Sequence, residues 1–268
     1  MIIGKRDFDL KNKTYIMGIL NVTPDSFSDG GQWTKADHAL RHVEAMIDEG
    51  ADIIDVGGES TRPGYTKISV DEECNRVIPV IEEIRKHFDV PISIDTYKAP
   101  VALGALQAGA DLVNDIWGFK ADTQIAELTV KYGAACCLMH NRKEPMYSDF
   151  MANVIDDLED SIYLAKTAGV PDDKIMVDPG VGFAKSYRQN LEVINKLEQL
   201  HQLNVPVLLG TSRKSVIGLA LSLPIDERLE GTIATTVIGV MKGVSFVRVH
   251  DIAANKRAIQ MTEEVLYG

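Results

Sequence analysis

The chain has 268 residues, of which 45% are hydrophobic and 25% are charged, as in ordinary globular proteins. Its 39 acidic residues outnumber its 28 basic ones, and the net charge of −11 gives it no general attraction to nucleic acid. No apolar run reaches the roughly 18 residues of a membrane span and the amino terminus is too polar for a signal peptide, so we expect a cytoplasmic protein without nucleic-acid or membrane partners.

The three cysteines do not form a metal-binding pattern. Cys136 and Cys137 are adjacent in an apolar run, Cys74 lies apart from them, and no C-x-x-C pair is present. No histidine or cysteine partner lies at a spacing typical of a zinc site. We therefore predict buried, reduced thiols.

Eight short and mostly apolar segments predict strands that are buried on both faces, as in a parallel sheet. They begin at Tyr15, Asp52, Pro91, Asp111, Ala134, Ile175, Val205 and Phe246. Most of the segments between them have helical periodicity, in which residues such as Val77, Ile81 and Ile84 form one apolar stripe. Ser69 followed by Glu72 predicts a capping box at the start of that helix.

Alternating strands and helices predict a parallel sheet, and eight repeats in about 250 residues favour a closed (β/α)8 barrel over an open doubly wound sheet. The first strand is not followed by the G-x-G-x-x-G loop that a dinucleotide-binding open sheet would need. No linker divides the chain, so residues 1–268 are expected to form a single α/β domain, a TIM barrel. Residues 1–13 would form a short N-terminal hairpin or plug beneath the barrel, and residues 141–153 a longer loop.

Polar residues recur at the ends of the predicted strands, where the active sites of such barrels lie. In chain order they are Asn21, Asp55, Glu59, Asp95, Asn114, Asp115, His140, Asp178, Ser212, Arg213, Lys214, Arg248 and His250. Two loops after strands, NVTPDSFSDGG from Asn21 and GGESTRPG from Gly57, are also dense in hydrogen-bonding residues. Ligand binding, more than core packing, requires such loops.

The types of these residues indicate a ligand class. Asp95, Asn114 and Asp178 suit the edge of a flat, nitrogen-rich heterocycle such as an amino-pyrimidinone ring. Lys214 could reach a ring carbonyl or nitrogen, and Arg248 could stack on the ring.

An anion subsite is expected beside the ring. Arg248, His250 and Thr61 suit a phosphate or pyrophosphate, and Asn21 offers an oxygen ligand for Mg²⁺. Ser215 stands where a helix should begin, a position that attracts anions.

Four residues remain open at this stage, because each has both a structural and a ligand-binding interpretation. Asp55 could contact ligand or only orient a loop, and His140 could be a packed strand-end residue. Trp117 and Phe183 could line the pocket or fill the top of the barrel.

The motifs NVTPDSFSDGG, GGESTRPG, SIDT, VNDI, LMH, DPGVGFAK, GTSRKS and RVHD, in this order, resemble those of bacterial dihydropteroate synthase. The match runs from about Tyr15 to the end of the chain. It implies a barrel enzyme, usually a homodimer, that condenses 6-hydroxymethyl-7,8-dihydropterin pyrophosphate with p-aminobenzoate in folate biosynthesis. The resemblance further implies a requirement for Mg²⁺, the products 7,8-dihydropteroate and pyrophosphate, and competition by sulfonamides for the p-aminobenzoate site.

The resemblance also implies roles for individual residues. Those that bind the pterin would be Asp95, Asn114, Asp178 and Lys214, with Arg248 stacked on the ring. Those that hold pyrophosphate and metal would be Asn21, Arg248 and His250. Two loops that close over the reacting centre would contribute Asp25, Phe27, Thr61, Arg62 and Pro63. Ser215 and its helix terminus would receive the p-aminobenzoate carboxylate.

One position departs from the family pattern. The family often has glycine where Ala184 stands, and we expect alanine to be tolerated unless that position requires a positive φ.

Because p-aminobenzoate is a weak nucleophile, we expect catalysis to act mainly on the leaving group, along a dissociative, carbocation-like path. One alternative is a pterin-dependent methyltransferase, which would not need the two polar loops or SRKS. The other is a catalytically silent pterin-binding paralogue, which would be expected to lose Asn21, Lys214, Arg248 or His250. A dimer interface would use apolar positions on the later helices, such as Ile238, Val240 and Met241.

Overall fold

A computed structural model describes residues 1–22, 35–59 and 67–268. Eight parallel strands form one sheet in the order β8-β7-β6-β5-β4-β3-β10-β9. Their bounds are β3 (Tyr15–Asn21), β4 (Ile53–Gly57), β5 (Ile92–Asp95), β6 (Leu112–Asp115), β7 (Ala135–Met139), β8 (Ile175–Asp178), β9 (Leu208–Leu209) and β10 (Phe246–Val249). A parallel bridge between Val177 and Val207 joins β8 to the β9 segment and nearly closes the barrel. All eight predicted strands and the barrel are confirmed.

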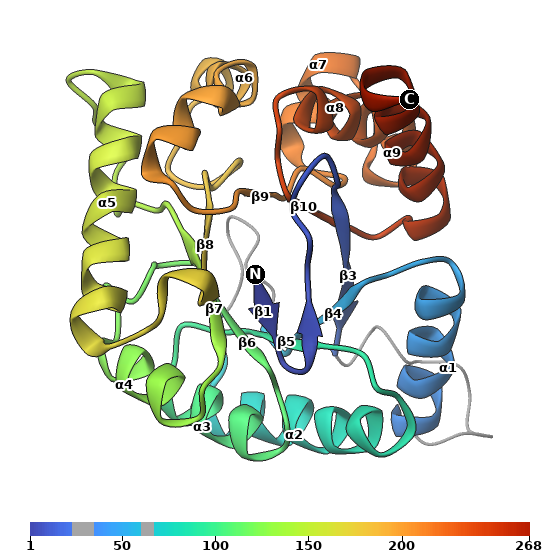
Figure 1. Cartoon of the computed structure of the whole chain (residues 1–268), viewed down its shortest axis with the longest axis vertical. Coiled ribbons are helices and arrows are strands. Elements are labelled where there is room, and N and C mark those ends of the chain that lie inside the picture. The colour runs from blue at the N-terminus through green and yellow to red at the C-terminus, as the bar shows by residue number, and fades with distance from the viewer. Residues whose placement is uncertain (23–34, 60–66) are drawn as a thin grey trace.

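Helices surround the strands on the outside of the barrel (Figure 1). They are α1 (Lys35–Asp48), α2 (Val70–His87), α3 (Ala99–Gln107), α4 (Gln124–Lys131), α5 (Phe150–Ala168), α6 (Tyr187–Asn195), α7 (Ser215–Leu221), α8 (Leu229–Met241) and α9 (Ile252–Tyr267). Short 3-10 turns, η2 (Asp172–Lys174), η3 (Leu197–Leu203) and η4 (Ile225–Glu227), lie between later elements. The loop predicted after the fifth strand ends earlier than expected, because Asp149 caps α5 by accepting the Ala152 N–H. Among the helices described, none is both long and apolar enough to cross a membrane.

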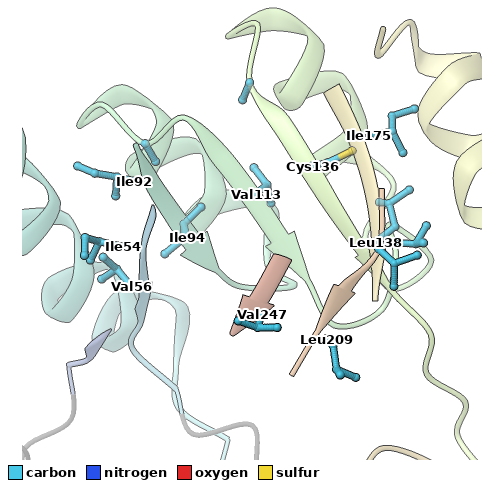
Figure 2. Packing of buried hydrophobic residues seen from close by; sticks show 14 of the residues in the cluster. Ile54, Val56, Ile92, Ile94, Val113, Cys136, Leu138, Ile175, Leu209 and Val247 are labelled. Carbon is cyan, nitrogen blue, oxygen red and sulfur yellow. The ribbon is translucent and has the colours of Figure 1, made fainter. Parts of the chain in front are cut away.

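The strands are apolar throughout because both of their faces are buried. Side chains such as Ile54, Ile94 and Val113 point outward into the layer between strands and helices (Figure 2). Alternate residues, such as Met17 and Leu112, point into the barrel and form a second cluster. A continuous apolar run satisfies both layers, which explains why the sequence shows no simple alternation.

The predicted N-terminal hairpin is confirmed, and it closes the amino-terminal end of the barrel. β1 (Ile2–Ile3) pairs antiparallel with β2 (Arg6–Asp7). Phe8 follows the hairpin and is buried against Tyr15 and Phe246, with ring centroids 4.8 Å and 5.5 Å away. The barrel interior is therefore apolar at this end, and polar groups inside it can reach solvent only at the other end.

Two local predictions have mixed outcomes. Ser69 caps α2 by accepting the Glu72 N–H at 3.1 Å, but the Glu72 carboxylate binds Arg76, so only half of the expected capping box forms. A complete, unpredicted capping box joins Ser186 and Gln189 at the start of α6.

The cysteine prediction is confirmed for Cys136 and Cys137, whereas Cys74 is less buried than expected. All three cysteines are free thiols, with Cys136 and Cys137 buried and Cys74 half-buried. Burial raises the pKa of Cys136 and of Cys137, which keeps both as unreactive thiols.

Truncating the plug tests its contribution to stability. Replacing Phe8 with alanine is expected to lower the free energy of unfolding by about 3 kcal/mol, because a buried ring is lost and a cavity remains. Ile2→Ala is the matched control in the same hairpin, since Ile2 is 40% exposed, and should cost less than about 1 kcal/mol. Urea unfolding measures both values, and equal losses would show that Phe8 does not seal the barrel.

Candidate active site

The predicted polar residues meet at the carboxyl-terminal mouth of the barrel because of strand register. Asp95 pairs with Asn114 on one side and with Gly57 on the other, and Asp178 pairs with Met139. Asp55, two residues before Gly57, faces the same interior. Asp55, Asp95, Asn114 and Asp178 are all buried.

Arg248 joins this cluster from β10. Its Nε donates to Asp55 Oδ2 at 2.6 Å, and its Nη2 donates to Asp95 Oδ2 at 2.7 Å. Burial disfavours the charged guanidinium, but Asp55 and Asp95 outweigh that effect and raise the pKa of Arg248 above its usual value. Asp55 thus orients Arg248. Asn114 Nδ2 lies 3.4 Å from both carboxylate oxygens of Asp55.

The second oxygen of Asp95 identifies where a ligand would bind. Asp95 Oδ1 is buried and has no hydrogen-bond partner among the described residues. Leaving a buried acceptor unpaired costs roughly 1–3 kcal/mol, so such an atom in a polar cluster indicates a missing donor. Burial raises the pKa of Asp95, and the Arg248 guanidinium opposes that rise.

Lys214 and Asp178 face each other across Gly210. A Cβ at Gly210 would lie 3.5 Å from Asp178 Oδ2 and 3.7 Å from Lys214 Nζ, so both polar side chains end beside this residue. Lys214 Nζ donates to the Val181 carbonyl at 2.6 Å and lies 5.0 Å from the centre of the Phe183 ring. Burial lowers the pKa of Lys214 to about 8, although the Asp178 carboxylate favours the charged form.

The loops after β9 and β10 are tied to each other. Arg213 binds the Asp251 carboxylate through Nε at 3.0 Å and Nη2 at 2.5 Å. This ion pair joins the loop that carries Lys214 to the loop that carries His250. Ser212 Oγ accepts the His250 backbone N–H at 3.2 Å and lies 2.9 Å from His250 Nδ1. The Ser212 hydroxyl thus contacts both the backbone and the ring of His250 and fixes the orientation of the imidazole.

The remaining site predictions fall in two groups. Asn21 ends β3 on the rim, with its Oδ1 3.9 Å from the place a Cβ would take on Gly57, and Ser215 begins α7 as an exposed residue. Outside the described residues lie Asp25, Phe27, Thr61, Arg62 and Pro63.

Two other strand-end residues, Asp115 and Glu59, have structural partners. The Asp115 carboxylate accepts the Trp117 and Phe119 N–H groups at 2.8 Å, which holds a turn. The Glu59 carboxylate binds Lys98 Nζ at 2.8 Å.

His140 is fully buried and sits in a side-chain network. Its Nε2 is 3.0 Å from Asp157 Oδ2 and its Nδ1 is 2.7 Å from Lys185 Nζ. No role was predicted for Lys185, although it belongs to the DPGVGFAK motif. The contact of the Val181 carbonyl with Lys214 could not be predicted either, because a backbone carbonyl is common to every residue type.

Residues 17–250 match the family model for pterin-binding enzymes. The chain is 58% identical to the dihydropteroate synthase of Clostridium beijerinckii, over 99% of both chains. The chain belongs to the dihydropteroate synthase family. It is therefore a dihydropteroate synthase, an enzyme of folate biosynthesis, as the resemblance implied.

Solved dihydropteroate synthases have the same fold. The Clostridium difficile enzyme, crystallised in the presence of pteroic acid, is 52% identical with a TM-score of 0.94, covering 98% of this chain and 100% of its own. The Yersinia pestis enzyme, in complex with a sulfonamide drug, is 38% identical with a TM-score of 0.93, covering 100% of this chain and 99% of its own.

The departure at Ala184 generates a prediction, because this residue has a φ of 44° and so lies in the left-handed region. Alanine there is strained by roughly 1–2 kcal/mol. Ala184→Gly is expected to raise the free energy of unfolding by about 1 kcal/mol in urea titrations. The control is Ala152→Gly, at an exposed position of α5, which should lose about 1 kcal/mol. A loss at both positions would contradict the strain.

His140 generates a prediction for stability against pH. Burial lowers the pKa of His140 to about 4, below the roughly 6.5 expected in the unfolded chain. The unfolded chain therefore binds the proton first, and stability is lost as the pH falls from about 6.5 towards 4. Between pH 7 and pH 5 the loss due to this residue is about 2 kcal/mol.

The measurement compares urea unfolding of the wild type and of His140→Gln at the two pH values. The variant should lose about 2 kcal/mol less than the wild type between pH 7 and pH 5, whatever its stability at pH 7. Identical pH dependence in the two proteins would show that His140 is not held neutral by the fold.

Proposed function

We propose that this enzyme condenses 6-hydroxymethyl-7,8-dihydropterin pyrophosphate with p-aminobenzoate to give 7,8-dihydropteroate and pyrophosphate, using the residues of the barrel mouth. The observation that carries the proposal is the unpartnered Oδ1 of Asp95 inside a buried polar cluster. A pterin edge presents N–H donors in a plane, which matches carboxylate acceptors on neighbouring strands.

We assign the pterin ring to the space between Arg248 and Lys214. Asp95 and Asp178 would accept from the ring edge, Asn114 would donate or accept beside them, and Arg248 would stack on the ring face. Lys214 Nζ would donate to a ring carbonyl or nitrogen. The relative that was crystallised in the presence of pteroic acid supports a pterin at this mouth.

We assign the pyrophosphate to Arg248, His250 and Asn21. The His250 imidazole would donate an N–H to a phosphate oxygen. Asn21 supplies one neutral oxygen, and the described residues contain no group of three or more His, Cys, Asp or Glu side chains able to hold a metal. This donor set fits a Mg²⁺ ion that enters with the substrate and takes most of its ligands from phosphate and water. When bound, Mg²⁺ would supply positive charge to the departing pyrophosphate.

We propose a dissociative path, since the arylamine is a weak nucleophile. Arg248 and His250 would stabilise the negative charge that builds on the leaving group. The carboxylates of Asp95 and Asp178 would favour a ring that gains positive charge as the bond breaks. Ser215 and the start of α7 would receive the p-aminobenzoate carboxylate, the position at which we expect sulfonamides to compete.

A further catalytic contribution is assigned to side chains outside the described residues. As the resemblance implies, Asp25, Phe27, Thr61, Arg62 and Pro63 would close over the reacting centre and exclude water from the cation.

We propose a homodimer that forms through the later helices. Leu219 on α7 is 64% exposed, Met241 on α8 is 63% exposed and Met261 on α9 is 64% exposed. Exposed apolar side chains on adjacent helices are typical of an interface. Of the three positions predicted from the sequence, Ile238 and Met241 are exposed, but Val240 is buried in the core and cannot take part.

A cytoplasmic location is also proposed. The three free thiols agree with a reducing compartment.

Pyrophosphate release from the dihydropterin pyrophosphate tests the function. We expect strong stimulation by p-aminobenzoate, loss of activity with EDTA, and slow release without the arylamine if the path is dissociative. Arg248→Ala should lower turnover by about 10²–10³, because it removes charge stabilisation of the leaving group.

A surface variant, Lys196→Ala, is the control and should keep wild-type turnover, because Lys196 only pairs with Glu192 at 2.7 Å within a turn of helix. Pterin binding without stimulated release would favour a silent paralogue. Unchanged turnover of Arg248→Ala at saturating substrate would remove the role assigned to Arg248.

A further inference from the structure

The loop between β8 and α6, residues 179–186, carries part of the proposed pterin site on its backbone. Its Val181 carbonyl accepts from Lys214 Nζ at 2.6 Å, and its Phe183 ring lies 5.0 Å from the same nitrogen. The place that Lys214 Nζ occupies therefore depends on the conformation of this loop.

Lys185 bonds to the backbone of the same loop. Its Nζ lies 3.0 Å from the Gly180 carbonyl, 3.1 Å from the Phe183 carbonyl and 2.7 Å from His140 Nδ1. An ammonium group has three N–H donors, so each of these acceptors takes one. The two carbonyls belong to residues on either side of Val181, and Lys185 thus fixes the part of the loop that receives Lys214.

His140 anchors Lys185 to the rest of the barrel. The Asp157 carboxylate can only accept, so His140 Nε2, at 3.0 Å, carries the hydrogen. The Lys185 ammonium can only donate, so His140 Nδ1 accepts. Both partners require the same neutral tautomer, and Arg142 Nε donates to the same Asp157 Oδ2 at 2.5 Å.

The loop has little room to move relative to this anchor. Gly180 has a φ of +69°, and a Cβ there would lie 2.0 Å from the His140 carbonyl oxygen. From α6, Asn190 Oδ1 accepts the Gly182 N–H at 2.6 Å, and Asn190 Nδ2 lies 3.2 Å from the Lys185 carbonyl. Asn190 thus holds the second half of the loop, while Lys185 holds the Gly180 and Phe183 carbonyls.

We propose that Lys185 is a positioning residue of the synthase reaction, which sets the β8–α6 loop so that the Val181 carbonyl and the Phe183 ring place Lys214 Nζ against the pterin. The inference deepens the proposed function and rests on it, because that function assigns Lys214 to the pterin. Lys185 acts through Lys214 and is given no contact with substrate.

The charge of Lys185 is consistent with this role. Burial lowers the pKa of Lys185 to about 7, and the nearby Asp178 carboxylate favours the charged form. The acceptors that bond to the Lys185 ammonium are neutral, and the Asp178 carboxylate near it favours its charge. Loss of the Lys185 charge would therefore also change the electrostatic environment of Asp178.

A double-mutant cycle tests the proposal by measuring the Kd of 6-hydroxymethylpterin, which carries the ring but no leaving group. Calorimetry is run on the wild type, Lys185→Met, Lys214→Ala and the double variant. We expect Lys185→Met to weaken binding about tenfold in the wild-type background and less than about twofold when Lys214 is already alanine. Lys185→Arg, which keeps N–H donors, should recover part of the affinity.

The control is Arg85→Met, which removes a half-buried cation that bonds to the Gly109 carbonyl and to Asp111 near the amino-terminal ends of the strands. It should lower stability and leave the Kd unchanged. If Lys185→Met does not fold, Lys185→Gln, which keeps an N–H donor, replaces it in the same cycle.

The possible outcomes separate the two ideas. Independent, multiplying effects of the Lys185 and Lys214 variants, or an unchanged Kd for Lys185→Met, would overturn the positioning role alone. A wild-type protein that does not bind 6-hydroxymethylpterin would instead overturn the proposed function.

Discussion

The mouth of this barrel depends on the bridge that the Arg248 guanidinium makes between the carboxylates of Asp55 and Asp95. β10 pairs with β3, β3 with β4 and β4 with β5, so the arginine side chain reaches past β3 to Asp55 and past β3 and β4 to Asp95. Three buried charges are tolerated only because each one has a partner at hydrogen-bonding distance. The bridge also leaves Asp95 Oδ1 unpaired, so the same contact that stabilises the cluster presents an acceptor to a ligand.

The apolar N-terminal hairpin closes one end of the barrel, so the polar side chains inside are accessible only from the mouth. With Phe8 and Ile3 filling the amino-terminal end, the interior changes from aromatic and aliphatic side chains to carboxylates, amide and cations along one axis. A charged side chain inside such a barrel has solvent or ligand on one side only. A ligand bound at this mouth would therefore lie in a low-dielectric environment, where directed hydrogen bonds discriminate between ligands more strongly than in water.

The fold could be predicted from the sequence because apolar segments, helical stripes and turn residues recur in a regular order. The inward or outward direction of each strand-end residue could not. Asn114 and Asp115 are adjacent, yet Asn114 faces the mouth and Asp115 holds a turn, because a strand buried on both faces shows no alternation that would tell them apart. The ninth strand, Leu208–Leu209, is also shorter than its apolar run, since Pro206 lacks an N–H to pair with a neighbouring strand.

The carboxylates, amide and cations that meet at the mouth were among the predicted residues, whereas Lys185 and the contacts made by the backbone were not. The Val181 carbonyl has no residue-specific signal, and Lys185 is understood only once its three acceptors are known. The positive φ of Ala184 is likewise invisible to composition, although the family resemblance, which implies glycine there, pointed to it.

The barrel is not equally strong around its circumference. The β8–β9 seam is held by one isolated bridge, Val177 to Val207, where the other neighbouring strands form continuous ladders. Local opening begins where backbone pairing is sparse, so amide hydrogens at this seam should exchange with solvent sooner than those of the arc from β3 to β7. Asp178 and Gly210 stand directly above it. The proposed pterin contact of Asp178 thus lies on the least firmly paired part of the barrel. A ligand bound there would hold β8 and β9 together.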